Sequence, residues 1–392
     1  MKTILPASQK NNNLFIGVLS GTSMDSINTI LMDFSNNNST IIATNKYPFN
    51  RHLTKNILQI INSKHCTLPE LGLLDRKLGI LFAKAINKLL TKANIKASDI
   101  TAIGSHGQNI WHSSQNKANF TMQIADPNII CTNCNITTIA DFRRKDIANG
   151  GQGAPLAPHF HKKIFSSNNK TRAIINIGGI SNITVLPKQN SQDVIGFDIG
   201  PGNCLMDEWV QTKFKSLNIK YDINSRLATQ GTIIAPLLEI CLKDYYFKKP
   251  YPKSTGREYF NLNWLNQKIL LAKIKRYNNL DILATLLELT VVTISNQIKI
   301  LNLKKHKYGI EEIYLCGGGA NNKTLLLLLQ NKINCKVTTT KDLGVHPDWV
   351  EAALFAWLAK QTINLKPGNL PSVTGAQKSA ILGAVYFKEL TK

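Results

Sequence analysis

Short apolar runs that end in glycine-containing turns are the main feature of the hydrophobic and polar pattern along the chain. The three most informative turns lie at residues 17–25, 175–182 and 315–322. Each turn follows an apolar run that predicts a buried strand, so its bare backbone N–H groups lie at the edge of a sheet. Successive N–H groups in such turns bind phosphate oxygens. The pattern therefore predicts a protein that binds a nucleotide.

The strand pattern of the first part of the chain recurs in the second part. In each part three strand-like segments form a meander, and a glycine turn joins the first two of them. The segments are 15–19, 29–34 and 41–46 in the first part, and 173–177, 183–186 and 194–198 in the second part. Two similar halves, each with a phosphate-binding hairpin, predict a nucleotide cleft between two domains.

Apolar residues at helical spacing predict helices that cover these sheets. The expected helices are 52–63, 68–93, 203–217, 282–301, 323–332, 349–363 and 378–390. We expect residues 102–105 to return to the first sheet and residues 106–108 to end that strand in a polar loop. Asp126 and Pro127 predict the start of a further short helix. Strands that alternate with helices in this order predict an α/β protein with layered sheets.

The length of 392 residues exceeds what one hydrophobic core usually serves, so we expect two domains. The first 13 residues are polar and the apolar run after them is short, which is unlike a signal peptide. No window approaches the roughly 20 apolar residues that a membrane helix needs. The seven cysteines have no regular spacing, which favours a reducing compartment over a disulfide framework. The sequence therefore predicts a cytoplasmic protein without a membrane partner.

The formal net charge of +23 raises the alternative of a nucleic-acid partner. Nucleic-acid-binding proteins concentrate Lys and Arg on one face or in one tail, whereas the lysines here are scattered as singles and pairs. The densest clusters are 143–145, 248–249 and 304–307. This distribution favours a solvated, lysine-rich surface and no nucleic-acid partner. The positive charge would still attract anionic substrates.

The first glycine turn, residues 20–25, combines groups that a magnesium nucleotide requires. Gly21 provides backbone freedom, Thr22 and Ser23 provide hydroxyls, and Asp25 provides a carboxylate. An ordinary polar hairpin turn is the alternative. The turn is not a Walker A loop, because no Gly-Lys-Ser/Thr sequence follows it.

Asp198 is the strongest candidate for catalysis. It ends an apolar strand and is followed by Gly200, Gly202 and the start of a helix at Asn203. Sheets of α/β proteins deliver catalytic groups at such strand ends. A helix-capping role is the alternative, but Asn203 is better placed for it. We therefore predict a catalytic role for Asp198.

Three further segments have both functional and structural interpretations. Residues 140–156 combine charges with a glycine loop, so Arg143 or Arg144 could clamp a polar ligand or pair with acidic residues at a domain hinge. Glu351 lies in the first turn of a helix, where the helix dipole favours an anion without any function. Cys131 and Cys134 have the spacing of half a zinc site, but no second pair accompanies them, which favours structural cysteines.

Together these motifs resemble the anhydro-N-acetylmuramic acid kinase family, in the family's order and over residues 17–383. The matching segments are 21–25, 105–108, 141–143 with 150–156, 176–182, Asp198 with 200–203, and 347–352. The family belongs to the superfamily of actin, hexokinase and heat-shock-chaperone ATPases. The resemblance implies duplicated actin-like ATPase domains of the ribonuclease H-like fold, with the nucleotide in an interdomain cleft. We expect residues 1–135 plus 370–392 to form the first domain and residues 136–369 the second.

The resemblance also implies an activity. The family uses ATP and water to open 1,6-anhydro-N-acetylmuramate and to phosphorylate it, which gives N-acetylmuramate 6-phosphate and ADP. This reaction belongs to peptidoglycan recycling in the cytoplasm, and the family is associated with homodimers. The chain departs from the family at one place: Ser26, Ile27 and Asn28 follow Asp25, where the family has Gly and then an acidic residue. Asn28 thus removes a charge from the phosphate turn.

The resemblance assigns roles to individual residues, with Asp198 as the base that takes a proton from the attacking water. The nucleotide-binding residues are Gly21, Thr22, Ser23, Met24, Asp25, Ser26, Ile27, Asn28, Gly178, Gly179, Gly317, Gly318, Gly319 and Asn321. The sugar-binding residues are His106, Gln108, Asp141, Arg143 and Glu351. Asp25 would bind Mg²⁺, directly or through water.

Other functions stay open at the level of sequence. A plain sugar 6-kinase of the same superfamily would also need a base, and Asp198 could deprotonate an open 6-hydroxyl. A non-catalytic sensor that binds ATP and sugar is the second alternative, and the altered residues Ser26 and Asn28 are its support. A nucleic-acid-associated protein is the third, supported only by net charge.

Overall fold

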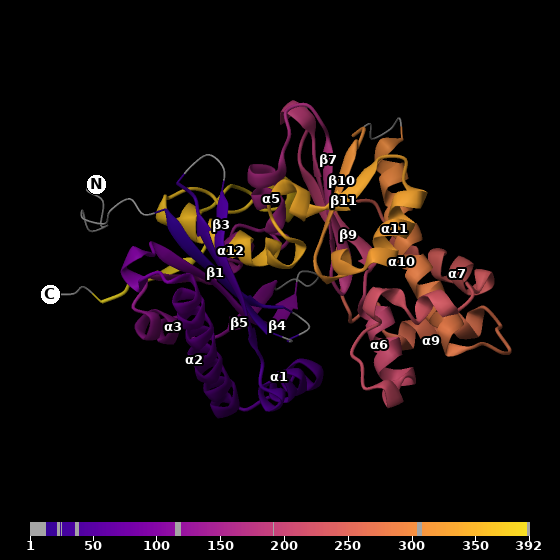
Figure 1. The fold of residues 1–392 in the computed structure, drawn as a ribbon, viewed down its shortest axis with the longest axis horizontal. Helices are drawn as coiled ribbons and strands as arrows, with labels where there is room; N and C mark the ends of the chain where they lie inside the picture. The colour runs from indigo at the N-terminus through magenta and orange to yellow at the C-terminus, as the bar shows by residue number, and fades with distance from the viewer. Residues whose placement is uncertain are drawn as a thin grey trace. The chain divides into compact units, whose positions relative to one another are not determined.

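The computed structural model describes residues 13–21, 24, 26–35, 39–113, 119–190, 192–303 and 308–389 (Figure 1). The chain divides into two compact units. Unit 1 is Met1–Phe160 with Trp349–Lys392, and unit 2 is His161–Asp348. The boundaries that we expected from the sequence, at 135/136 and 369/370, differ from these.

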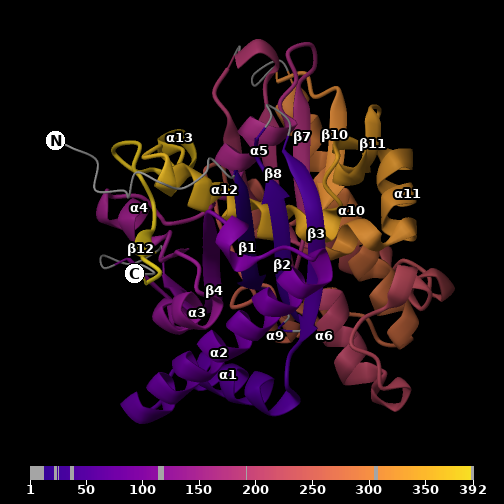
Figure 2. The same ribbon diagram turned by 60° about the vertical axis from the view of Figure 1, so that its left-hand side comes forward.

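Unit 1 is built on one sheet with the order β12-β6-β4-β1-β2-β3, and β5 pairs with β4. Its strands are β1 (Leu14–Ser20), β2 (Ser26–Asp33), β3 (Thr40–Pro48), β4 (Ala102–Ser113), β5 (Phe120–Ile124), β6 (Thr138–Ala140) and β12 (Ala384–Tyr386). The first three strands form an antiparallel meander, and β4 then pairs with β1 in parallel. Figure 2 shows β1, β2 and β3 side by side.

Unit 2 is built on a sheet with the order β11-β10-β7-β8-β9. Its strands are β7 (Arg172–Ile177), β8 (Ile180–Leu186), β9 (Ile195–Pro201), β10 (Glu312–Cys316) and β11 (Lys336–Thr339). As in unit 1, three antiparallel strands come first, and the first of them then pairs in parallel with a later strand. The repeated order confirms both the α/β class and the duplication, and it is the order expected of ribonuclease H-like domains.

Helices cover both faces of the unit 1 sheet. They are α1 (Arg51–Ser63), α2 (Leu68–Ala93), α3 (Pro127–Cys134), α4 (Arg144–Ala148), α12 (Val350–Ile363) and α13 (Pro371–Thr374), while α5 (Ala157–Phe165) contains the unit boundary. Ile16 and Val18 of β1 share a buried cluster with α2, whereas Gly17 between them faces α12. Because neighbouring side chains on a strand point to opposite faces, α2 and α12 lie on opposite sides of the sheet.

Glycines allow α12 to lie directly on the sheet. A Cβ at Gly17 would overlap the carbonyl oxygen of Ala352, and one at Gly104 would overlap that of Phe355. The helix backbone therefore contacts β1 and β4 without an intervening side chain. This docking makes α12 part of unit 1, which explains why the second boundary falls near 349 and not at 369/370.

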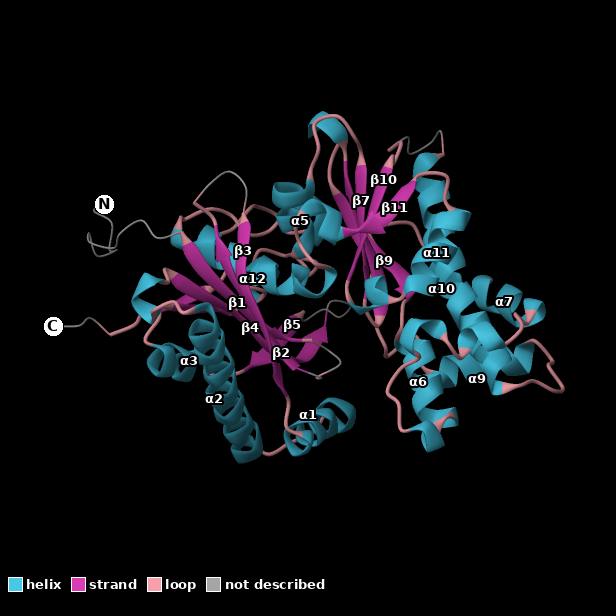
Figure 3. Ribbon diagram, viewed as in Figure 1, coloured by secondary structure: helices cyan, strands magenta, loops and turns pink. Residues whose placement is uncertain are grey.

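The helices of unit 2, cyan in Figure 3, contribute to one large apolar core. They are α6 (Cys204–Lys213), α7 (Ala235–Leu242), α8 (Tyr245–Lys248), α9 (Leu262–Leu271), α10 (Asn279–Asn302) and α11 (Lys323–Lys332). Among the residues that the structure describes, one helix, α10, is long and apolar enough to cross a membrane by length and composition. Of its apolar window 78% is buried inside the structure, so this surface is occupied by core packing.

Three local predictions are wrong. The helix expected at 378–390 does not form over 378–389, because β12 instead pairs antiparallel with β6, and residue 390 lies outside the described residues. Residues 106–108 are not a loop, because β4 continues through them and pairs with β1 past a bulge. Asp198 does not end its strand, since β9 continues to Pro201 and pairs with β8 as far as Ile180.

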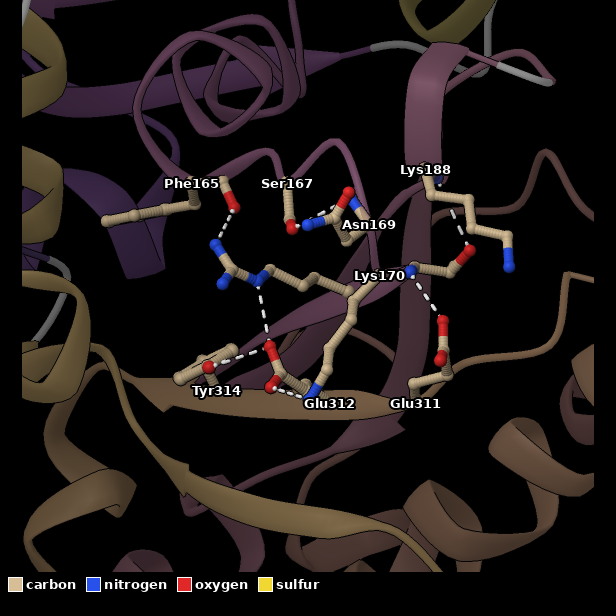
Figure 4. Close-up of polar contacts among 10 residues, drawn as sticks. Phe165, Ser167, Asn169, Lys170, Lys188, Glu311, Glu312 and Tyr314 are labelled. Carbon is tan, nitrogen blue, oxygen red and sulfur yellow. Dashed lines mark hydrogen bonds and ion pairs between the residues drawn. The ribbon is translucent and has the colours of Figure 1, made fainter.

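A polar cluster ties the beginning of β7 to β10 (Figure 4). The Glu312 carboxylate accepts hydrogen bonds from Lys170 Nζ at 2.8 Å, Arg172 Nε at 2.9 Å and the Tyr314 hydroxyl at 2.9 Å. Although burial opposes it, these hydrogen bonds lower the pKa of Glu312 to about 2. Since Lys170 and Arg172 lie at the beginning of β7 and Glu312 lies on β10, the cluster stabilises the parallel β7–β10 pairing.

Candidate active site

Asp198 lies in the middle of β9 and is held by three hydrogen bonds. Its carboxylate oxygen Oδ2 accepts the backbone N–H of Thr255 at 3.0 Å. Its own N–H donates to the carbonyl oxygen of Lys253 at 3.0 Å, and the Tyr246 hydroxyl donates to its carbonyl oxygen at 2.7 Å. The side chain is partly exposed. Asp198 is thus fixed in place, and its Oδ1 has no hydrogen-bond donor among the residues that the structure describes.

The surroundings of Asp198 make it a stronger base than an ordinary aspartate. Burial raises its pKa to about 6, and the negative charge of Glu258 acts in the same direction. The Thr255 hydrogen bond and the charge of Lys253 act in the opposite direction. A carboxylate with a pKa near 6 is still ionised at neutral pH and accepts a proton more readily.

The glycine turn after β7 is tied to the beginning of α6. The N–H groups of Gly202 and Cys204 donate to the carbonyl oxygen of Gly179 at 2.9 and 3.1 Å, and that of Asn203 donates to Gly178 at 2.8 Å. Asn203 holds the N-cap position of α6, but its side chain makes no capping bond and donates to Ile177 O at 3.4 Å. The capping role expected of Asn203 is therefore wrong, because its backbone is already helical there.

Arg257, a cation that the sequence pattern did not single out, lies against this glycine turn. A Cβ at Gly179 would lie 2.9 Å from Arg257 Nε, so the guanidinium contacts the glycine directly. Arg257 is exposed. A guanidinium beside backbone N–H groups is an arrangement that suits phosphate oxygens.

The third glycine turn, 317–319, lies against the end of β7. Gly317 has a φ of +77°, and its Cα faces Ile177 and the side chain of Asn176. Asn321 Nδ2 donates to Asp348 Oδ1 at 2.6 Å. The fold of unit 2 thus brings together two of the three glycine turns that the sequence predicted.

The first glycine turn is described only in part. Thr22, Ser23 and Asp25 lie outside the described residues. The N–H of Met24 donates to Gly21 O at 3.1 Å, and Ser26 Oγ donates to Asn28 Oδ1 at 2.9 Å. Met24 and Ile27 are buried in the core of unit 1. The side chains of these two residues are therefore not available to a nucleotide.

In unit 1 the structure brings together His106, Arg143 and Glu351. Arg143 Nε donates to His106 Nε2 at 3.1 Å, and the His106 ring packs on Phe355 with centroids 4.5 Å apart. Burial lowers the pKa of Arg143 to about 10, against the charges of Glu351 and Asp146. Burial and the Arg143 charge hold the pKa of His106 well below its usual range. The pair is thus a charged guanidinium beside a neutral imidazole.

Two other predicted sugar-binding residues have different environments. Gln108 is 1% exposed inside β4, and its amide Nε2 donates to Asn109 O at 3.0 Å. Asp141 is partly exposed, has a φ of +60°, and lies 3.6 Å from Arg144 Nε. Burial raises the pKa of Asp141, against the charge of Arg144. Asp141 is therefore accessible, whereas the Gln108 side chain is enclosed.

Asp146 is a buried residue that sequence reasoning missed. Its carboxylate accepts hydrogen bonds from Gly153 N at 2.8 Å, Asn369 Nδ2 at 2.7 Å and Thr374 Oγ1 at 2.8 Å. The carbonyl oxygen of Gly153 in turn accepts Arg143 Nη1 at 2.9 Å. Asp146 thus fixes the glycine loop that orients Arg143. Its place in a run of charges gave no signal of this role.

Among the described residues, no group of three His, Cys, Asp or Glu side chains could hold a metal ion. Cys131 and Cys134 are buried free thiols. Burial raises the pKa of both thiols, that of Cys134 to about 12. This environment agrees with the structural interpretation of the two cysteines.

Comparisons with known proteins give a consistent result. A family model described as "Anhydro-N-acetylmuramic acid kinase" matches residues 13–388. A relative of that name from Coxiella burnetii is 47% identical over 378 residues, which is 96% of this chain and 98% of the relative. Relatives of the same name from Photobacterium profundum and Shewanella sediminis are 47% and 45% identical over 95% and 96% of this chain, and over 98% and 99% of their own lengths.

A solved structure titled "Activator of the 2-Hydroxyisocaproyl-CoA Dehydratase from Clostridium difficile with bound ADPNP" is also similar. The alignment covers 90% of this chain and 97% of that chain, with 13% identity and a TM-score of 0.40.

Proposed function

Because the chain belongs to the anhydro-N-acetylmuramic acid kinase family, we propose that Asp198 is the base of its reaction and that the glycine turns bind its ATP. The enzyme is a kinase of amino-sugar metabolism that uses ATP and the anhydro sugar. Water and ATP convert 1,6-anhydro-N-acetylmuramate to N-acetylmuramate 6-phosphate and ADP. We place this reaction in the cytoplasm, in peptidoglycan recycling.

The environment of Asp198 is the observation that carries the proposed chemistry. As water attacks the anomeric carbon, its proton passes to the Asp198 carboxylate, and the bond between that carbon and the bridging 6-oxygen breaks. The 6-oxygen takes the γ-phosphoryl group of ATP in place of a proton, and ADP leaves. The pKa of about 6 suits a base that must be ionised at neutral pH.

Phosphoryl transfer depends mainly on positioning and on neutralising charge. Gly179 would bind phosphate oxygens through its backbone N–H, while the Gly178 N–H donates to Ile180 O at 3.3 Å and shapes the turn. Arg257 beside them adds a positive charge. Gly21, Ser26 and Asn28 would act on the phosphates from unit 1, and Gly317–Gly319 with Asn321 would lie near the adenosine. Mg²⁺ would enter bound to the ATP phosphates, which need only one or two protein carboxylates in addition. Asp25 stays the candidate for that ligand.

The group formed by His106, Arg143 and Glu351 in unit 1 supplies the proposed sugar contacts. Arg143 is charged, and its hydrogen bonds to Gly153 O and His106 orient it. The charge of Glu351 raises the pKa of Arg143. Such a fixed guanidinium suits a carboxylate, and N-acetylmuramate carries one in its lactyl group. Because Gln108 is enclosed, we expect it to act on the sugar less directly than Asp141 or Glu351.

Arg143→Ala and Glu351→Ala should each raise the KM for the anhydro sugar by about tenfold or more, since loss of a charged hydrogen bond costs about 1.5–3 kcal/mol. The Kd for ATP should change by less than about threefold. Steady-state kinetics and calorimetry of nucleotide binding measure the two effects. Lys145→Ala, which removes an exposed cation of the short helix α4, is the matched control. A fall in ATP affinity at constant sugar KM would contradict the assignment.

The proposed reaction is tested by product analysis with ATP, Mg²⁺ and 1,6-anhydro-N-acetylmuramate in ¹⁸O-labelled water. We expect the label at the anomeric carbon, a phosphate at the 6-position and one ADP for each sugar. Phosphorylation of the open sugar alone would favour a plain 6-kinase, and binding without ADP release would favour a sensor.

We also propose that the protein forms a homodimer. Light scattering after gel filtration tests this proposal.

A further inference from the structure

Lys253 is a buried lysine beside the proposed base. It lies in the irregular segment between α8 and α9 and is 9% exposed. Its carbonyl oxygen accepts the N–H of Asp198 at 3.0 Å, and two residues later Thr255 donates its N–H to the Asp198 carboxylate. The segment that carries Lys253 is therefore fixed to Asp198 at both of these points.

Two aromatic rings determine where the ammonium group lies. Lys253 Nζ is 5.0 Å from the centroid of the Tyr246 ring and 6.0 Å from that of Phe197. Phe197 is the neighbour of Asp198 on β9, and Tyr246 donates its hydroxyl proton to Asp198 O at 2.7 Å. Cation–π contacts of this kind stabilise an ammonium that has lost part of its water. The rings thus keep the positive charge close to Asp198.

The charges of the Lys253 ammonium and the Asp198 carboxylate act on each other. Burial lowers the pKa of Lys253 to about 8, the Asp198 charge opposes this, and Lys249 acts in the same direction as burial. Of the other ionisable groups around Asp198, Glu258 raises its pKa and Tyr246 has a pKa far above the working range. The paired strand β8 has no ionisable side chain. Between about pH 6 and 8 the carboxylate and the ammonium are both charged.

We propose that Lys253 is a positioning residue whose buried ammonium keeps the Asp198 carboxylate ionised, and therefore able to accept the proton of the attacking water. This inference rests on the proposed role of Asp198 as the base. Lys253 acts through Asp198 and not through contact with the substrate. Lys253 also belongs to a segment more than 50 residues away from Asp198, so no local motif reveals it.

The test is the dependence of kcat on pH in Lys253→Met. In the wild type, activity should rise with pH through about 6, as Asp198 loses its proton. The variant should show this rise at a pH higher by about one unit, because a nearby opposite charge lowers a carboxyl pKa by about 1–3 units. At pH 6 the rate should then fall by about fivefold. Near pH 9 the two enzymes should converge, since Lys253 of the wild type is then neutral.

Two variants separate charge from packing. Lys253→Arg keeps the charge and should keep the rise at the wild-type pH, while Lys248→Met removes an exposed lysine of α8 and should change nothing. If Lys253→Met does not fold, Lys253→Gln makes the same test. A rise at the wild-type pH in the neutral variants, or an equal displacement in Lys253→Arg, would overturn the proposal.

Failure of this inference is distinguishable from failure of the proposed function. If the substrate is wrong, wild-type enzyme releases no ADP with the anhydro sugar. If Asp198 is not the base, Asp198→Asn stays active. If Asp198→Asn is inactive and the acid side of the Lys253→Met profile does not move, only the role of Lys253 is wrong.

Discussion

Asp198→Asn should lower kcat by about 10²–10⁴-fold, the usual contribution of a positioned general base, while ATP and the anhydro sugar still bind. The amide has the shape of the carboxylate, and its oxygen can accept the Thr255 N–H as the Asp198 carboxylate does. Ground-state contacts therefore survive. The amide cannot take a proton from water, so the barrier to opening the bridge rises.

Both products should disappear together in this variant, because capture of the 6-oxygen by phosphate accompanies water attack. ADP release and sugar opening are measured in one reaction, and calorimetry measures both binding constants. Asp193→Asn, an exposed residue before β9, is the control. If the variant made the 6-phosphate at near the wild-type rate, the base would have to be another residue, with Glu351 the first candidate.

Asp146→Asn should destabilise unit 1 by about 2–4 kcal/mol, because hydrogen bonds to a charged group contribute about 1.5–3 kcal/mol each. The carboxylate is 0% exposed and accepts donors from Gly153, Asn369 and Thr374. A carboxylate only accepts, whereas an amide also presents an NH₂ group. In either orientation the amide therefore places a donor against a donor.

Calorimetry should show the melting of unit 1 at a temperature lower by roughly 5–10 °C. Asp141→Asn makes the same chemical change at a partly exposed site on the same segment. It should change the melting temperature of unit 1 by less than about 2 °C. Since Gly153 orients Arg143, the Asp146 variant should also have a raised KM for the sugar below its melting temperature. An unchanged melting temperature would mean that the three donors find other acceptors.

Several elements could be predicted because their signals are local. Residues 68–93 and 323–332 form α2 and α11 with the bounds that the apolar spacing predicted. The two meanders also follow from alternation along each strand, and the structure confirms them as β1–β3 and β7–β9. The segment after 378 was predicted wrongly because its apolar residues satisfy a helical spacing, while pairing with β6 decides that they form β12.

The sequence by itself determined the two halves and the glycine turns at strand ends, and it singled out Asp198 as the candidate base, because periodicity, turn residues and motifs act within a few positions. Only the tertiary structure decided that α12 docks on Gly17 and Gly104, and that Asp146 joins residues 369 and 374. It alone placed Lys253 and Thr255 around Asp198. Each of these contacts joins residues more than 50 positions apart, and chain folding brings them together without leaving a periodic trace in the sequence.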